Sequence, residues 1–256
     1  MMNTTVRINL EKQMFGTLTK RLVDYGELTV DAFLYASGVE ALELRNTAGG
    51  VTILPYHGQQ IWRCGFHGRE LTMRSLFEEP TGSRNYLENY GGFLLHCGAT
   101  AMGVPSAEDT HPLHGELPNA PYQSAEIVAG ECDGLPYVSV RGRYEHKVAF
   151  NFHYLAEPSI TLASGSSLID VDMTITNLRG ETMPLMYMMH INHKPENNAE
   201  LIYSASKTPD AVRIHNSVPD HMKSERIEDL KFLWIASNLN PIFITSFPPI
   251  SPSIRR

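Results

Sequence analysis

Two short polar segments of the sequence carry histidines at positions that packing alone does not explain. Residues 110–121 hold His111 and His114 together with one glycine and three prolines, and residues 190–195 begin with His190 and continue through Asn192. Imidazole groups exchange protons near neutral pH and bind metal ions. A proline-rich loop holds its side chains with little conformational entropy left to lose. These segments are therefore the first candidates for acid–base chemistry or ligand binding.

A third segment, residues 90–99, combines glycines with a histidine. Gly91 and Gly92 precede an apolar run that contains His96, and glycine lets a backbone or a ligand approach closely. If the chain around His190 is extended, His190 and Asn192 project from the same face, which favours one shared site. The alternative for each segment is structural: a strand-end histidine caps exposed carbonyls, and a proline-rich loop covers a sheet edge.

Metal binding is the main chemical alternative. His111 with His114, and His190 with His193, form two His-x-x-His pairs, and neutral imidazoles in such sets hold zinc or manganese in metal-dependent sugar isomerases. The spacing suits a helix, where residues three apart are neighbours. Pro112 and the extended character of the second segment instead place the histidines of each pair on opposite faces. We therefore expect neither a metal site nor a cofactor.

The elements that must position these residues are strands. Apolar and polar side chains alternate over residues 169–176, which predicts a half-buried strand that forms a hairpin with residues 159–162. Turns rich in glycine predict two further hairpins, formed by residues 127–131 with 137–144 and by residues 41–46 with 51–54. This repeated pattern predicts an all-β fold, a large antiparallel β-sandwich.

Three segments depart from the hairpin pattern. Residues 12–25 and 220–230 have weak helical patterns, and residues 185–190 are apolar on both faces, which predicts an inner strand. No change in composition divides the chain. We therefore expect a single domain over residues 1–256, with an irregular tail over residues 241–256.

Composition excludes several classes of protein. Among 256 residues, 42% are hydrophobic and 19% are charged, values typical of a folded globular protein. The net charge of −7 and the lack of a basic run argue against a nucleic-acid partner. The sequence has neither a long apolar run nor a basic, apolar leader, so we expect no membrane span and no secretory signal. Three widely spaced cysteines suit a reducing compartment, and we expect a cytoplasmic protein.

Two motifs resemble those of a known superfamily. Leu113-His114-Gly115 resembles a Leu-His-Gly segment of the aldose 1-epimerases, or galactose mutarotases, and His190-Ile191-Asn192 resembles their histidine-containing strand end. Residues 54–195 are similar to an uncharacterised subgroup of this superfamily, of the DUF4432 type, mainly through residues 90–103 and 111–122. The resemblance implies a large antiparallel sandwich that binds a sugar in a groove on one sheet.

The resemblance also implies roles for individual side chains. Mutarotation opens the sugar ring, so one group protonates the ring oxygen while another removes the proton of the anomeric hydroxyl. By resemblance, His190 is the general acid, and His114 binds the sugar and polarises the ring oxygen. The partner is a small-molecule carbohydrate, and the oligomeric state stays open. The residues expected to bind substrate are His57, His96, Asn119 and Asn192.

Two departures from the superfamily affect these roles. His57 stands near the position where relatives carry a substrate-facing arginine. Relatives supply a glutamate base from one of their last strands, whereas no acidic residue follows Asp229 here, and residues 241–256 contain four prolines. We therefore expect a sandwich that lacks some C-terminal strands. The alternative function is a sugar-binding protein without turnover, for which candidate aromatic contacts are Tyr56, Trp62, Phe66 and Tyr122.

Overall fold

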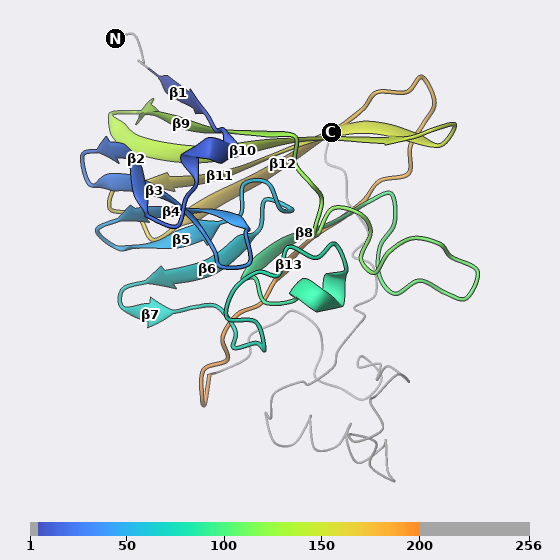
Figure 1. Ribbon diagram of the computed structural model, residues 1–256, viewed down its shortest axis with the longest axis horizontal. Coiled ribbons are helices and arrows are strands. Elements are labelled where there is room, and N and C mark those ends of the chain that lie inside the picture. The colour runs from blue at the N-terminus through green and yellow to red at the C-terminus, as the bar shows by residue number, and fades with distance from the viewer. Residues whose placement is uncertain (1–4, 200–256) are drawn as a thin grey trace, which may run out of the picture. The chain divides into compact units, whose positions relative to one another are not determined.

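A computed structural model of the chain describes residues 5–199, and within them two antiparallel sheets dominate (Figure 1). The five-stranded sheet has the order β1-β9-β10-β11-β12, and the eight-stranded sheet has the order β13-β8-β6-β5-β4-β3-β2 with β7 paired to β6. The strands of the first sheet are β1 (Val6–Asn9), β9 (Ser124–Cys132), β10 (Leu135–Val148), β11 (Phe152–Ala163) and β12 (Ile169–Asn177). Those of the second are β2 (Lys20–Tyr25), β3 (Leu28–Leu34), β4 (Glu40–Asn46), β5 (Gly49–Ile53), β6 (Ile61–Phe66), β7 (Arg69–Glu70), β8 (Leu94–Ala99) and β13 (Met186–Ile191).

The two sheets share one hydrophobic core, which makes the fold a sandwich. Leu42 and Leu44 of β4 belong to the same buried cluster as Ile127 of β9 and Ile160 of β11. The remaining elements in residues 5–199 are two short 3-10 helices, η1 (Lys12–Met14) and η2 (Tyr86–Asn89). The predicted all-β sandwich is confirmed.

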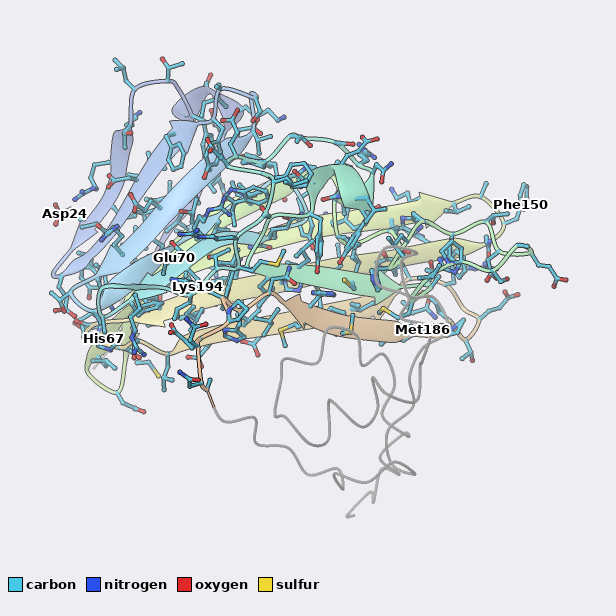
Figure 2. All side chains as sticks on the ribbon, turned by 90° about the horizontal axis from the view of Figure 1, so that it is seen from below. Asp24, His67, Glu70, Phe150, Met186 and Lys194 are labelled. Atoms are coloured by element: carbon cyan, nitrogen blue, oxygen red, sulfur yellow. The ribbon has the colours of Figure 1, made fainter. Side chains whose placement is uncertain are left out.

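All three predicted hairpins are present. β11 pairs with β12, β9 with β10, and β4 with β5, each antiparallel. The β4–β5 turn is tighter than the sequence indicates, because Gly49 and Gly50 already belong to β5. Glycine is required at position 49, since a Cβ atom there would lie 2.2 Å from the carbonyl oxygen of Gly65 on β6. The long β10–β11 hairpin carries Phe150 at its tip, toward the same end of the sandwich as Met186 of β13 (Figure 2).

One expectation about an element is wrong. The segment 12–25 is not a helix, because only Lys12–Met14 forms a 3-10 turn and Lys20–Tyr25 pairs with β3 across a glycine turn. The segment 185–190 does form a strand, β13, which ends the eight-stranded order of residues 5–199. Its predicted inner position stays a prediction.

Met1–Lys194 form one compact unit, which includes both sheets, and Pro195–Arg256 form a second unit. The predicted helix over 220–230, the irregular tail over 241–256 and the expected loss of C-terminal strands lie outside the described residues. The single domain over residues 1–256 stays a prediction. No helix within residues 5–199 is long and apolar enough to cross a membrane.

Candidate functional site

The structure brings His114 and His190 together. His190 lies on β13, where it pairs with Leu95 of β8, and His114 lies in the loop that follows β8. Their ring centroids are 5.8 Å apart at an interplanar angle of 67°. A separation of this size puts both imidazoles within reach of one small ligand. The two residues that carry the resemblance therefore form a single candidate site.

The backbone around His114 is fixed against the end of β8. The amide of Gly98 donates to the carbonyl oxygen of His114, and the amide of His114 donates to that of Gly103, each over 2.9 Å. His114 and Gly115 both have positive φ angles, of 60° and 82°. A Cβ atom on Gly115 would lie 2.4 Å from the carbonyl oxygen of Gly98, so only glycine permits this approach.

Glu116 anchors the same loop to both sheets. Its Oε1 accepts hydrogen bonds from the amides of Ala99 (3.2 Å) and Thr100 (3.1 Å) and from the hydroxyl of Tyr154 (2.6 Å). Its Oε2 accepts from the hydroxyl of Thr100 over 2.9 Å. Because Tyr154 belongs to β11, this carboxylate links the loop to the five-stranded sheet. Glu116 is the acidic residue closest to His114 in sequence, yet both of its oxygens are engaged in holding the loop.

Two tyrosine rings line the histidine pair. The ring of Tyr86, in η2, lies 4.9 Å from that of His114 and 6.5 Å from that of His190. The ring of Tyr90 lies 5.8 Å from that of His190, edge to face. The hydroxyl of Tyr90 donates to Oδ1 of Asn192 over 2.9 Å, and Nδ2 of Asn192 donates to the carbonyl oxygen of Gly92 over 3.0 Å. Asn192 therefore orients Tyr90 beside the pair.

Arg63 holds the tyrosine-bearing loop in place. Its guanidinium donates four hydrogen bonds of 2.9 Å, to the carbonyl oxygens of Trp62, Phe77, Glu78 and Gly91. Three of these acceptors belong to the segment that leads into and out of η2. The guanidinium also lies over the Trp62 ring at 4.9 Å. This planar group, with donors in fixed directions, suits four separate acceptors.

The polar groups of the site are incompletely paired, and burial shifts their pKa values. Burial lowers the pKa of His114. Burial also lowers the pKa of His190, as does the neighbouring His114, while the amide of Asn192 acts in the opposite direction. Nδ1 of His114, Nδ1 of His190 and the hydroxyl of Tyr86 are buried and have no hydrogen-bond partner. Unpaired buried polar atoms are rare in folded proteins. Here three of them belong to neighbouring rings, which marks these rings as a candidate ligand-binding surface.

Comparison with known proteins identifies the family. The profile described as "Domain of unknown function (DUF4432)" matches residues 36–196. The chain belongs to this family. Among solved structures, it resembles the crystal structure of a "putative aldose 1-epimerase" from Klebsiella pneumoniae subsp. pneumoniae MGH 78578, with a TM-score of 0.60 and 18% identity. A search of the curated proteins finds no match.

The structural match covers 73% of this DUF4432 chain and 51% of the Klebsiella chain, so this chain spans about half the length of that protein. The likeness establishes a shared fold of the aldose 1-epimerase type. The family match confirms the DUF4432 subgroup that the sequence predicts, and the structural likeness confirms the predicted fold.

His57 and Asn119 lie together in a separate polar network of the DUF4432 chain. Nε2 of His57 is 3.1 Å from both Oδ1 of Asn119 and Nδ2 of Asn89. Oδ1 of Asn119 also accepts from Gln60 over 2.8 Å, and its Nδ2 donates to the carbonyl oxygen of Arg84 over 3.3 Å. Burial lowers the pKa of His57. These contacts join the segment that contains His57 and Gln60 to η2 and to the loop that contains Asn119. The substrate-binding roles of His57 and Asn119 stay predictions.

The side chain of His96 points to the face of β8 opposite to that of Leu95, the partner of His190. His96 pairs with Met189 while His190 pairs with Leu95, and neighbouring residues of a strand point to opposite faces. Nδ1 of His96 is 2.7 Å from the hydroxyl of Tyr187. The side chain is fully buried, which lowers its pKa to about 4. The structure therefore does not bring His96 to the His114–His190 pair.

The remaining histidines of the two motifs point elsewhere. His193 packs edge to face on Phe93, with ring centroids 5.1 Å apart, and Nδ1 of His111 faces the carbonyl oxygen of Pro112 at 2.8 Å. In the part of the chain that the structure describes, no three potential metal-ligating side chains converge.

Sequence reasoning missed Tyr86, Arg63 and Glu116. Tyr86 lies in a 3-10 turn with no periodic pattern, and the partners of Arg63 are backbone carbonyls that no motif marks. The aromatic residues proposed for a sugar floor belong mainly to the core, since Trp62, Phe66 and Tyr122 are all buried in hydrophobic clusters.

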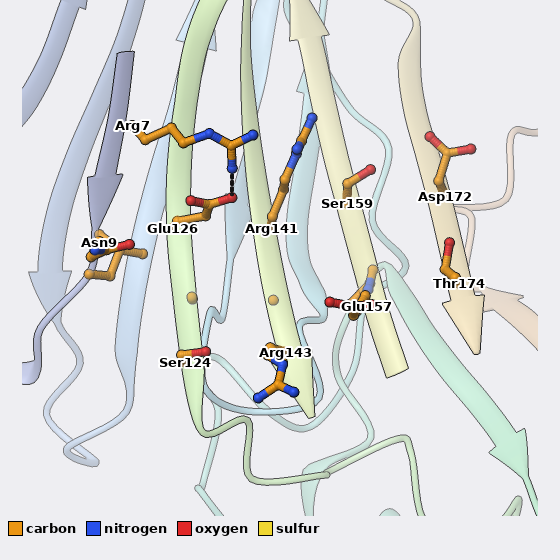
Figure 3. A pocket seen from close by; sticks show the side chains of 14 residues that line it. Arg7, Asn9, Ser124, Glu126, Arg141, Arg143, Glu157, Ser159, Asp172 and Thr174 are labelled. Atoms are coloured by element: carbon orange, nitrogen blue, oxygen red, sulfur yellow. Dashed lines mark hydrogen bonds and ion pairs between the residues drawn. The ribbon is translucent and has the colours of Figure 1, made fainter. Parts of the chain in front are cut away.

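A separate groove lies on the outer face of the five-stranded sheet (Figure 3). Its volume is about 550 Å³, and its charged lining residues are Arg7, Glu126, Arg141, Arg143, Glu157 and Asp172. Arg7 and Glu126 form an ion pair of 2.6 Å. Three arginines and three carboxylates thus line the groove, and none of the predicted site residues does.

Proposed function

We propose that this DUF4432 protein binds a free sugar or sugar derivative at the His114–His190 pair and interconverts its anomers. The observation that carries the proposal is the contact between two imidazoles from distant parts of the chain, each with an unpaired nitrogen. The rings of Tyr86 and Tyr90 beside them supply the apolar surface that a sugar ring packs against. The fold shared with the Klebsiella structure supports the same assignment.

The proposed reaction breaks the bond between the anomeric carbon and the ring oxygen. His190 gives a proton to the ring oxygen while a base takes the proton of the anomeric hydroxyl, and closure on the other face reverses both transfers. His114 donates a hydrogen bond to the ring oxygen and favours its protonation. Since the proposed acid must carry a proton and burial lowers its pKa, the catalysed rate should rise as the pH falls from about 8 toward 6.

A second candidate function is sugar binding without turnover. The observation in its favour is that, within residues 5–199, no carboxylate contacts either imidazole, and Glu116 is engaged by four donors. The segment in which relatives supply a glutamate base falls outside these residues.

Anomer exchange measured on the full chain separates the two functions. Freshly dissolved α-D-galactose and α-D-glucose are followed by NMR with wild-type protein, His190→Ala and His153→Ala. His153 lies on β11 of the five-stranded sheet, and its Nε2 is 2.8 Å from Oε1 of Glu145. Because His190 belongs to the other sheet, the His153 variant is the control. We expect wild type and control to accelerate exchange, and His190→Ala to lose about 10²–10⁴-fold of the acceleration.

Three outcomes distinguish the possibilities. Undiminished exchange by His190→Ala contradicts the acid assignment. Saturation-transfer signals from bound sugar without faster exchange identify the non-catalytic function. A wild-type protein that neither binds nor interconverts any tested sugar refutes the proposed function as a whole.

A further inference from the structure

Tyr86 carries a buried hydroxyl that nothing in the described chain satisfies. The residue is 6% exposed, and its hydroxyl has no hydrogen-bond partner. The neighbouring Tyr90, whose ring centroid is 5.2 Å away, instead donates its hydroxyl to Asn192. Two adjacent tyrosines in the same turn thus differ in one respect: Tyr90 has a partner within the protein, and Tyr86 does not.

We propose that Tyr86 is a ligand-binding residue whose hydroxyl donates a hydrogen bond to an oxygen of an uncharged sugar. The inference rests on the proposed function and adds to it both a residue and a substrate class. It follows from the position of the phenol, which contacts the rings of His114 and Tyr90 and reaches His190. A ligand oxygen that accepts from the phenol would supply the partner that the protein does not provide for this buried hydroxyl.

The protonation state of the phenol fits a donor role. Burial is the largest of the effects that raise the pKa of Tyr86, and nearby Cys97 and Tyr90 add to it. The hydroxyl therefore keeps its proton across the physiological range. A buried donor without an acceptor is costly, and a sugar oxygen, which accepts hydrogen bonds, would remove that cost on binding.

The charge of the surroundings points to a neutral ligand. Within residues 5–199, no lysine, arginine or carboxylate forms a hydrogen bond with the hydroxyl of Tyr86 or with Nδ1 of His114 or His190. Phosphate and carboxylate groups are usually bound by arginine or lysine. The groups gathered here are a phenol and two imidazoles whose pKa values are lowered by burial, a set that suits the hydroxyl and ring oxygens of an unmodified aldose.

A matched pair of variants tests the role of the hydroxyl. Tyr86→Phe removes a hydroxyl with no partner, so we expect its thermal midpoint to equal or exceed that of wild type by about 1–3 °C. Tyr90→Phe leaves Oδ1 of Asn192 without its donor, so we expect its midpoint to fall. D-Galactose and D-glucose are then titrated by saturation-transfer NMR, with His153→Ala as the binding control. For Tyr86→Phe we expect affinity to fall about tenfold.

Galactose 6-phosphate tests the substrate class in the same titration, and we expect it to bind no tighter than galactose. The proposal is overturned if Tyr86→Phe binds the sugar like wild type, or if its midpoint falls as that of Tyr90→Phe does, because the hydroxyl would then have a partner in the folded protein. Tighter binding of the phosphate overturns the assignment of a neutral ligand. If wild type binds no sugar, the proposed function fails first, whereas sugar binding that does not depend on Tyr86 refutes this inference alone.

Discussion

Acidification should destabilise the protein through His96. The full burial of this imidazole lowers its pKa from the ordinary value of 6.5 to about 4. The folded protein therefore binds this proton less readily than the unfolded chain does. By linkage, the contribution is fully present above about pH 6.5, declines as the pH falls, and is lost below about pH 4.

The pKa values fix the size of the effect. A fall from 6.5 to about 4 corresponds to ~3 kcal/mol of the free energy of unfolding. His57, His114 and His190 also have lowered pKa values, so the wild-type protein alone would report their sum. The variant His96→Gln isolates one group, because glutamine does not titrate and can still accept a hydrogen bond from the hydroxyl of Tyr187.

Urea unfolding of wild type and His96→Gln between about pH 7.5 and pH 4 provides the measurement. We expect the stability advantage of wild type over the variant to shrink by ~3 kcal/mol across this range. Two curves that stay parallel would refute the reasoning, since His96 would then bind its proton equally well in both states. An advantage that grows on acidification would mean that the folded state favours the imidazolium ion, through a partner that the structure does not contain in residues 5–199.

The anchoring contacts around the site lead to two further predictions. Glu116→Ala leaves the Ala99 and Thr100 amides and the Tyr154 hydroxyl without an acceptor, so urea unfolding should show a loss of ~2–4 kcal/mol. Glu116→Gln keeps one acceptor oxygen, so it should lose less stability than Glu116→Ala and retain much of any anomer exchange. If Glu116→Gln abolished exchange without loss of stability, Glu116 would be the base instead. Arg63→Lys replaces a four-donor plane by a point charge and should cost ~1–3 kcal/mol. Arg63→Lys should also weaken sugar binding, because Arg63 holds the segment that carries Tyr86 and Tyr90. Unchanged stability and unchanged binding would contradict this role of Arg63.

Periodicity along the strands predicted most of the fold. Residues 169–176 alternate because one face of β12 packs on the core and the other is exposed, and the structure shows that alternation. The same rule failed at Lys20–Tyr25, where a register shift between Arg21 and Val23 interrupts the period of two. At β13 it predicted the strand itself, which pairs with β8.

The histidine pair could be predicted because short motifs mark His114 and His190. The contacts that position the pair could not, because their partners are remote in sequence or belong to the backbone. Glu116 is bonded to Tyr154 on the opposite sheet, and Arg63 is bonded to carbonyl oxygens of Phe77 and Gly91. Neither bond leaves a pattern in the residue types. His96 was predicted to bind substrate because it lies in the glycine-rich segment 90–99. The pleat of β8 instead turns its side chain away from the His114–His190 pair.

The pairing of β13 with β8 has a consequence for how the protein acquires its site. Leu94 and its partner Ile191 are separated in the chain by all of β9 to β12, and closing such a long loop is entropically slow compared with forming local hairpins. On the ribosome, His114 would be synthesised and packed against β8 well before His190 emerges. Completion of the candidate site is thus a late event in biogenesis, and a nascent chain stalled before Met186 would contain β1 to β12 and only one of the two imidazoles.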